Sequence, residues 1–240
     1  MMTEAVHAYL RAHLDEAFAK NRESIAAVAD LIVERHLGGR RVYAFGSGHS
    51  HLLVEEMYYR AGGLDLVTPI WDTALMLHED ARRSSELECT PGYFRNVLRD
   101  VGWQSGDVLW LISNSGRNFL AIELAQAARS AGVTVVAMLS VAHSRAVRSA
   151  SPEAPKLFEM ADYILDNGGV VGDAGLAVPG IELPMVPTST VAGAALVHAV
   201  WAEAAARLAR RGQAPRVYVS FNVDDQSGDE RGDAPARDSQ

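Results

Sequence analysis

The stretch Val108–Asn118 constrains the fold more than any other part of the chain. Its first five residues, VLWLI, are all apolar and do not alternate with polar residues, which predicts a strand buried on both faces. Such a strand belongs to a parallel sheet that helices cover on both sides. The strand ends at a cluster of Ser, Asn and Gly, and helical spacing resumes from Phe119 to Arg129.

A strand, a turn of small residues and a helix together favour an anion. Ser113 and Ser115 each carry a hydroxyl, and Gly116 lets the backbone approach a ligand closely. The first N–H groups of the following helix attract negative charge. The turn therefore predicts a phosphate site, although an ordinary strand-to-helix turn with a Ser cap has the same composition.

The same pattern recurs along the chain. Apolar strands are predicted at residues 41–45, 64–69, 108–112, 133–139 and 163–165, with helices between them. Polar clusters follow four of these strands, at residues 46–51, 113–118, 140–144 and 166–169. Because ligands of parallel α/β sheets bind beyond the carboxyl ends of the strands, we expect a binding site there.

The remaining segments complete the predicted architecture. Two helices are expected over residues 3–37, then helices at 52–60, 91–101 and 188–211, while residues 75–87 are ambiguous. Residues 168–187 read as an irregular connection, and residues 216–221 as a last strand. We expect one domain over residues 1–222 and an acidic disordered tail over residues 223–240.

Charge and cysteine content exclude several classes of protein. The net charge is −8, so a general nucleic-acid surface is not expected. Cys89 is the only cysteine, which rules out an internal disulfide and suits a reducing compartment. Because no secretion signal and no apolar run of about 20 residues is seen, we expect a soluble cytoplasmic protein without a membrane span.

Five short runs resemble the sugar isomerase (SIS) domain. They are GSGHSH at 46–51, YRAGG at 59–63, ISNSGRN at 112–118, SVAHS at 140–144 and PTST at 187–190. The resemblance covers about residues 5–222 and is closest to small stand-alone SIS proteins without an assigned activity. It implies a three-layer αβα sandwich, with a central parallel sheet of about five strands and an N-terminal helical arm. Phosphoheptose isomerases and N-acetylmuramic acid 6-phosphate etherases are related families.

The resemblance also implies a phosphosugar ligand and a set of binding residues. Ser113, Ser115 and Asn118 are expected to hold the phosphate, and Ser47 and Ser50 to close over the same ligand. Other candidates in the polar clusters and at the start of the last helix are His49, Asn114, Arg117, Ser140 and Thr188. SIS proteins usually form dimers or tetramers with sites near the subunit interface, so a homodimer or homotetramer is expected.

Glu55 and Glu56 are the candidate catalytic carboxylates. They lie on the helix after the first polar turn, about 100° apart, so both cannot face one point. A carboxylate held against the apolar residues of this helix suits a general base or acid. The alternative is a pair of solvated helix carboxylates.

Histidines supply the second group of catalytic candidates. His198 follows Thr190 by eight residues, the spacing at which phosphoheptose isomerases place a histidine used in metal binding and proton transfer. A core histidine on an Ala-rich helix is the alternative. His51 is a further candidate, because it flanks Ser50 in the first turn. Whether His78, His143, Asp166 or Asn167 reaches the site is left open by the sequence.

This sequence lacks the set of metal-ligating residues that phosphoheptose isomerases carry. Arg60 falls where an acidic ligand is expected, and Thr190 is a poor ligand, so we expect neither a metal nor another cofactor.

The resemblance favours, as the expected function, an enzyme that removes the C2 proton of an N-acetylamino-sugar 6-phosphate such as N-acetylglucosamine 6-phosphate. Elimination or dehydration at C2–C3 is ranked ahead of aldose–ketose isomerisation. A non-catalytic phosphosugar sensor is the third hypothesis. A dinucleotide site is disfavoured, because His51 stands where the third glycine of the G-x-G-x-x-G turn would be.

Overall fold

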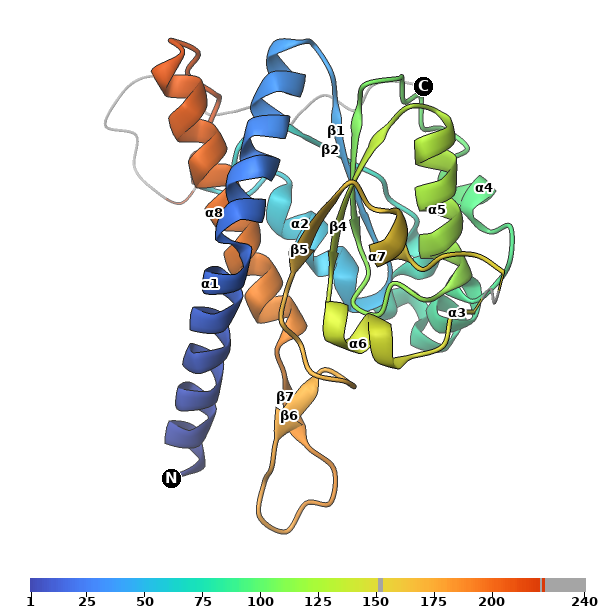
Figure 1. Cartoon of the computed structure of the whole chain (residues 1–240), viewed down its shortest axis with the longest axis vertical. Coiled ribbons are helices and arrows are strands. Elements are labelled where there is room, and N and C mark those ends of the chain that lie inside the picture. The colour runs from blue at the N-terminus through green and yellow to red at the C-terminus, as the bar shows by residue number, and fades with distance from the viewer. Residues whose placement is uncertain (151–152, 221, 223–240) are drawn as a thin grey trace.

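The computed structural model describes residues 1–150, 153–220 and 222, and centres on a parallel sheet (Figure 1). Within these residues the sheet has five strands in the order β2-β1-β3-β4-β5. The strands are β1 Val42–Gly46, β2 Val67–Pro69, β3 Val108–Ile112, β4 Thr134–Leu139 and β5 Tyr163–Asp166. Each neighbouring pair is parallel, so the predicted α/β class with about five parallel strands is confirmed.

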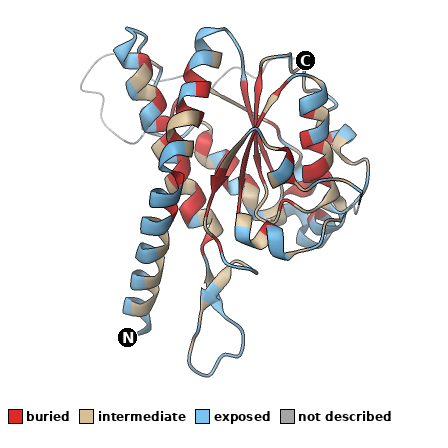
Figure 2. Ribbon diagram, viewed as in Figure 1, coloured by how far each residue is buried: buried red, intermediate tan, exposed pale blue. Residues whose placement is uncertain are grey.

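Alternate residues of β3 enter two separate apolar layers. Trp110 and Ile112 pack with the helices α1 Met2–Leu37, α2 His51–Met57 and α8 Ser189–Arg210. Leu109 and Leu111 pack on the opposite face with α4 Phe94–Val97, α5 Phe119–Ser130 and α7 Leu157–Met160. All five β3 residues are buried, which explains the unbroken apolar run (Figure 2).

The N-terminal arm is one helix, and the expectation of two helices over residues 3–37 is wrong. α1 runs unbroken for 36 residues, because neither Gly nor Pro interrupts it. Its buried residues begin at Ala17, and the preceding half extends past the end of the sheet (Figures 1 and 2). The second half of the helix packs against α8 and β5.

Asn21 ties α1 to the edge strand β5. Its Nδ2 donates to the carbonyl of Asp166 (2.7 Å) and its Oδ1 accepts from the N–H of Asp166 (2.8 Å). The buried amide thus supplies the two hydrogen bonds that a further strand would make. Lys20 adds an ion pair with the Asp166 carboxylate at 2.8 Å.

The last helix, α8, lies within the range predicted for it and is strongly apolar. By length and by a mean hydropathy of 1.2 it meets the requirement for a membrane span. In the structure it packs on α1 and α2 as a core helix, with Leu196, Val197 and Val200 fully buried. Gly193 permits the close approach of α2, because a Cβ at that position would lie 2.5 Å from Leu53 Cδ1.

Several predicted boundaries shift. The helix expected at 52–60 ends at Met57, and the strand expected at 64–69 begins at Val67. Of the helix predicted for residues 91–101, only α4 is α-helical. Most of the ambiguous segment, residues 75–87, belongs to the helix α3 Leu77–Glu88. A short 3-10 turn, η2 Thr73–Leu75, precedes this helix.

The chain between β5 and α8 contains a hairpin. Strands β6 Ala174–Leu176 and β7 Met185–Pro187 pair in antiparallel fashion within the segment predicted as irregular. The last predicted strand, at 216–221, is reduced over its described residues to one bridge between Val217 and Leu64. The predicted acidic tail, 223–240, lies outside the described residues.

Candidate functional site

A cavity of about 400 Å³ lies at the carboxyl ends of the parallel strands. The turns after β1, β3 and β5 line it together with the ends of α3 and α8. Its lining residues are Ser47, Gly48, His49, Ser50, Leu53, Leu77, Ser85, Glu88, Ile112, Ser113, Asn114, Ser115, Asn118, Met138, His143, Asn167, Asp173, Pro187, Ser189 and Thr190. The site expected at this edge of the sheet therefore coincides with a hydroxyl-rich cavity.

The first wall is the turn between β1 and α2. After β1 the chain enters a short 3-10 helix, η1 Gly48–Ser50. Gly46 is required where this turn folds back, because a Cβ there would lie 2.6 Å from the Ser50 carbonyl oxygen. Gly48 has a φ of 56° and begins the turn. These two glycines shape the turn in which Ser47 and Ser50 line the cavity.

The second wall is the turn between β3 and α5. Gly116 has a φ of 57°, and a Cβ at this position would lie 3.0 Å from Leu157 Cβ. Its N–H donates to Ser113 Oγ at 3.3 Å. Asn118 occupies the N-cap position of α5 without a capping side-chain bond, and its side chain faces the cavity. The turn thus places Ser113, Ser115 and Asn118 at the positive end of a 12-residue helix.

The third wall follows β4 and β5. Asn167 Nδ2 donates to Asn114 Oδ1 at 2.9 Å, which joins this wall to the second turn. His143 Nδ1 accepts the N–H of Gly172 at 2.9 Å, so the neutral ring carries its proton on Nε2. His143 and Asn167, which the sequence left open, therefore both reach the cavity.

Asp173 closes the wall at the start of α8. Its carboxylate accepts from the N–H groups of Thr188 (3.2 Å) and Ser189 (2.9 Å) and from Ser189 Oγ (2.6 Å). This carboxylate is therefore occupied by donors of the chain and neutralises the positive end of α8.

Glu88, the last residue of α3, is the second carboxylate in the cavity. It accepts one hydrogen bond, from Ser47 Oγ at 2.9 Å. A carboxylate has about four acceptor positions, so Glu88 can accept further donors from a ligand. Burial, then the neighbouring Glu88 carboxylate, raises the pKa of the Cys89 thiol, and a raised pKa makes that thiol a weak nucleophile.

The predicted binding residues divide into two groups. Ser47, His49, Ser50, Ser113, Asn114, Ser115 and Asn118 line the cavity, whereas Arg117, Ser140 and Thr188 do not. Ser140 is fully buried and supports the third wall by donating to the carbonyl of Gly169 at 2.5 Å. Thr188 is also fully buried, one residue before the cavity-lining Ser189.

The four predicted catalytic residues lie outside the cavity lining. His51 is buried beside η1, with Nδ1 against the carbonyl of Gly48, and its Nε2 is 3.6 Å from Glu55. Glu55 lines a different hollow of about 830 Å³ beside Trp71. Glu56 contacts His198 (2.8 Å) and Arg60 (2.7 Å).

The Glu56–His198 contact distinguishes the two adjacent glutamates. Leu53, one turn before Glu56, lines the cavity, and so does Thr190, two turns before His198. The Glu56–His198 pair therefore lies between α2 and α8, farther along both helices than the residues that line the cavity. Glu55 instead lines another hollow. His78 and Asp166 do not line the cavity either: the His78 ring lies 6.0 Å from that of His51, and Asp166 pairs with Lys20.

Sequence reasoning missed Ser85, Glu88, Asp173, Ser189 and Thr190 as cavity residues. Ser189 and Thr190 belong to the PTST run, which carried a signal, but only Thr188 was selected from it. Glu88 lies at the end of the ambiguous segment, and Asp173 lies in the irregular connection, so neither had a local pattern to indicate it. Over the described part of the chain, no group of three or more His, Cys, Asp or Glu side chains is arranged to hold a metal ion.

Comparison by sequence finds one matching family model and close relatives of the chain. A family model described as SIS domain matches residues 7–140. A UPF0309 protein of Halalkalibacterium halodurans is 42% identical over 211 residues, which are 88% of this chain and 87% of that protein.

Two solved structures share the fold. Phosphoheptose isomerase of Neisseria gonorrhoeae matches with a TM-score of 0.53 and 20% identity, over 84% of this chain and 97% of that one. The Vibrio vulnificus NanR protein, complexed with ManNAc-6P, matches with a TM-score of 0.51 and 16% identity, over 88% of this chain and 65% of that one.

Proposed function

The chain belongs to the SIS domain family, and from this premise we propose that its cavity binds a sugar phosphate and removes the proton at C2 of the sugar. The observation that carries the proposal is the convergence of strand-end turns on one hydroxyl-lined cavity. Its volume of about 400 Å³ lies in the range of small-molecule sites.

The phosphate is assigned to the turn before α5. Ser113 and Ser115 offer hydroxyl donors there, Asn118 offers an amide, and the helix N-terminus favours an anion. Ser50 faces the same space from the first wall. This arrangement agrees with the role that the sequence resemblance implies for these residues.

Glu88 is the carboxylate best placed to act as the base. It lies in the cavity and has unused acceptor positions, whereas Asp173 is occupied by three donors. His143 carries a proton on Nε2 and lines the same cavity, so it can donate to an oxygen of the sugar.

An N-acetylamino-sugar 6-phosphate is the proposed substrate, with elimination as the reaction. Glu88 takes the C2 proton of the open-chain aldehyde, and the electron pair forms the C2–C3 double bond. The C3 oxygen leaves as water with a proton from the acid. The ligand named for the Vibrio protein is an N-acetylamino-sugar 6-phosphate, which supports this class of substrate.

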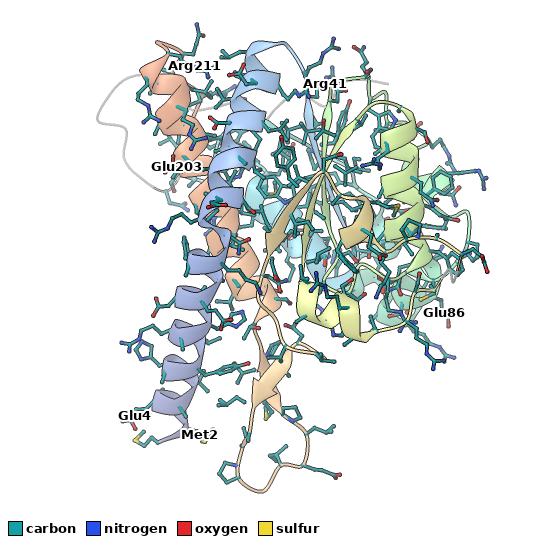
Figure 3. All side chains as sticks on the ribbon, in the orientation of Figure 1. Met2, Glu4, Arg41, Glu86, Glu203 and Arg211 are labelled. Carbon is teal, nitrogen blue, oxygen red and sulfur yellow. The ribbon has the colours of Figure 1, made fainter. Side chains whose placement is uncertain are left out.

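Incubation with N-acetylglucosamine 6-phosphate tests the reaction. We expect an unsaturated aldehyde that absorbs in the ultraviolet, together with loss of one water. Glu88→Gln should lower kcat by at least about 100-fold, the usual contribution of a general base. Glu86→Gln is the matched control, because Glu86 lies two residues earlier on α3 and pairs with Arg82 on the surface (Figure 3).

The Glu56–His198 pair is the second candidate for proton transfer. If Glu56→Gln abolishes turnover while Glu88→Gln retains it, the base belongs to that pair. Incorporation of solvent deuterium at C2 without loss of water would show that the reaction is isomerisation or epimerisation and not elimination. Binding without turnover, unchanged in both variants, would support the sensor hypothesis.

We further propose that the protein acts in the cytoplasm as a homodimer or homotetramer. The single cysteine suits a reducing compartment. The exposed apolar residues of the β6–β7 hairpin support assembly.

A further inference from the structure

The cavity is unusual in its charge. Its lining contains two carboxylates, Glu88 and Asp173, and among the described residues no Lys or Arg contributes to it. Arg117, although next to Gly116 in the second turn, is not part of the lining. A phosphate bound here is therefore held by hydroxyl, amide and imidazole groups and a helix end, without Lys or Arg from the described lining.

We propose that this cavity accepts sugar phosphates whose sugar part is neutral or carries an amino group, and rejects those that bear a carboxylate on the sugar. This inference rests on the proposed phosphosugar function. It narrows the substrate class to exclude acidic sugars such as N-acetylmuramic acid 6-phosphate.

Two long helices, α5 and α8, begin at the cavity with polar lining residues, and of these two only α5 has a start that is open to a ligand anion among the residues that the structure describes. The start of α5 carries Asn118, Ser113 and Ser115 and serves the phosphate. The start of α8 is already occupied, because Asp173 accepts from Thr188 N–H and Ser189 N–H. A second anion on the ligand would therefore meet the Asp173 carboxylate at the start of α8.

Glu88 determines which groups on the sugar are favoured and which are repelled. Among the residues that the structure describes, Ser47 is the one hydrogen-bond donor to Glu88, so the remaining acceptor positions of this carboxylate suit a sugar hydroxyl or an ammonium group. A ligand carboxylate has no proton to donate at neutral pH and would meet like charge in a partly enclosed space, where screening by water is reduced. Repulsion by Glu88 should weaken binding of such a ligand by at least about tenfold.

Three compounds test the inference by isothermal titration calorimetry. They are N-acetylglucosamine 6-phosphate, N-acetylmuramic acid 6-phosphate and the methyl ester of the latter's lactyl carboxylate. The ester matches the acid in size but lacks its negative charge. We expect the ester to bind at least about tenfold more tightly than the acid.

Glu88→Gln should reduce the difference in binding affinity between the acid and the ester. Glu86→Gln, which lies outside the cavity, should leave that difference in affinity unchanged. Equal binding of acid and ester, or an unaltered difference in Glu88→Gln, would overturn the inference while leaving phosphosugar binding intact. Failure of the ester together with the acid would mean exclusion by size and would also overturn it. If none of the three compounds binds, the proposed function fails and this inference fails with it.

Discussion

At the scale of single residues, the second turn has the clearest consequence for binding. Ser113 lines the cavity and its Oγ accepts only a long hydrogen bond from Gly116 N–H, which leaves the hydroxyl proton for a ligand. Ser113→Ala should weaken binding of N-acetylglucosamine 6-phosphate by about tenfold or more, the value of one hydrogen bond to a charged group.

Calorimetric titration measures this effect, and Ser130→Ala is the control. Ser130 lies at the far end of α5, where its hydroxyl donates to the carbonyl of Gln126. Equal affinities of wild type and Ser113→Ala would remove this serine from the phosphate site.

Tyr93 predicts a pH dependence of stability. Burial, a hydrogen bond to Asp72 and the charge of Asp72 raise the pKa of the Tyr93 phenol from 10.0 to about 12. Between these pH values the unfolded chain loses the phenol proton and the folded chain keeps it. The folded state then binds more protons, so its stability falls as the pH rises through this window.

Urea unfolding at a series of alkaline pH values measures the effect. Tyr93→Phe should show a shallower fall in the free energy of unfolding than the wild type between about pH 10 and pH 12. Parallel curves for the two proteins would contradict the assignment.

At the scale of elements, β5 depends on α1 for its outer hydrogen bonds. Asn21→Ala would leave the buried N–H and carbonyl of Asp166 without their partner. Each unsatisfied buried group costs about 1–3 kcal/mol, so for two groups we expect a loss of about 2–6 kcal/mol in the free energy of unfolding.

Chemical denaturation monitored by circular dichroism measures this loss. Asn96→Ala on α4 is the control, because Asn96 is exposed and bonds only to Arg99 among the contacts described for its side chain. A change of under about 0.5 kcal/mol, the usual range for surface substitutions, would show that β5 does not need α1.

The elements also show what local sequence can and cannot predict. β3 was predictable because burial on both faces leaves an unbroken apolar run. Two apolar stripes over residues 3–37 predict two helices, but both lie on the single helix α1, because no helix-breaking residue separates them.

The candidate site was predictable only in part, for a similar reason. Its serine turns follow apolar strands and so carry a local signal. Glu88 becomes a site residue only through its contact with Ser47, 41 residues away in the chain. A contact between residues so far apart in the chain leaves no periodic pattern in the local sequence.

At the scale of the whole molecule, the β6–β7 hairpin projects away from the sheet and its helices (Figure 1), and several apolar residues of this segment are exposed. Ile181 is 54% exposed, Leu183 73% and Met185 48%. Exposed apolar clusters of this kind mark interaction surfaces. We expect the wild type to form an oligomer, and Leu183→Asp to shift it toward the monomer mass of 25.9 kDa.

Light scattering coupled to size exclusion measures the mass. Leu37→Asp, an exposed apolar position at the C-terminal end of α1, is the matched control and should keep the wild-type mass. A monomeric wild type, or an unchanged mass for Leu183→Asp, would exclude the hairpin from the interface.

The order of synthesis gives the long first helix a further consequence. α1 is made before the rest of the fold, yet it packs against β5 and α8, near the other end of the chain. Its apolar stripe therefore has no lasting cover until the ribosome has produced more than a hundred further residues. During that interval we expect chaperones that shield nascent chains to bind this stripe, and we expect the packing of α8 to displace them.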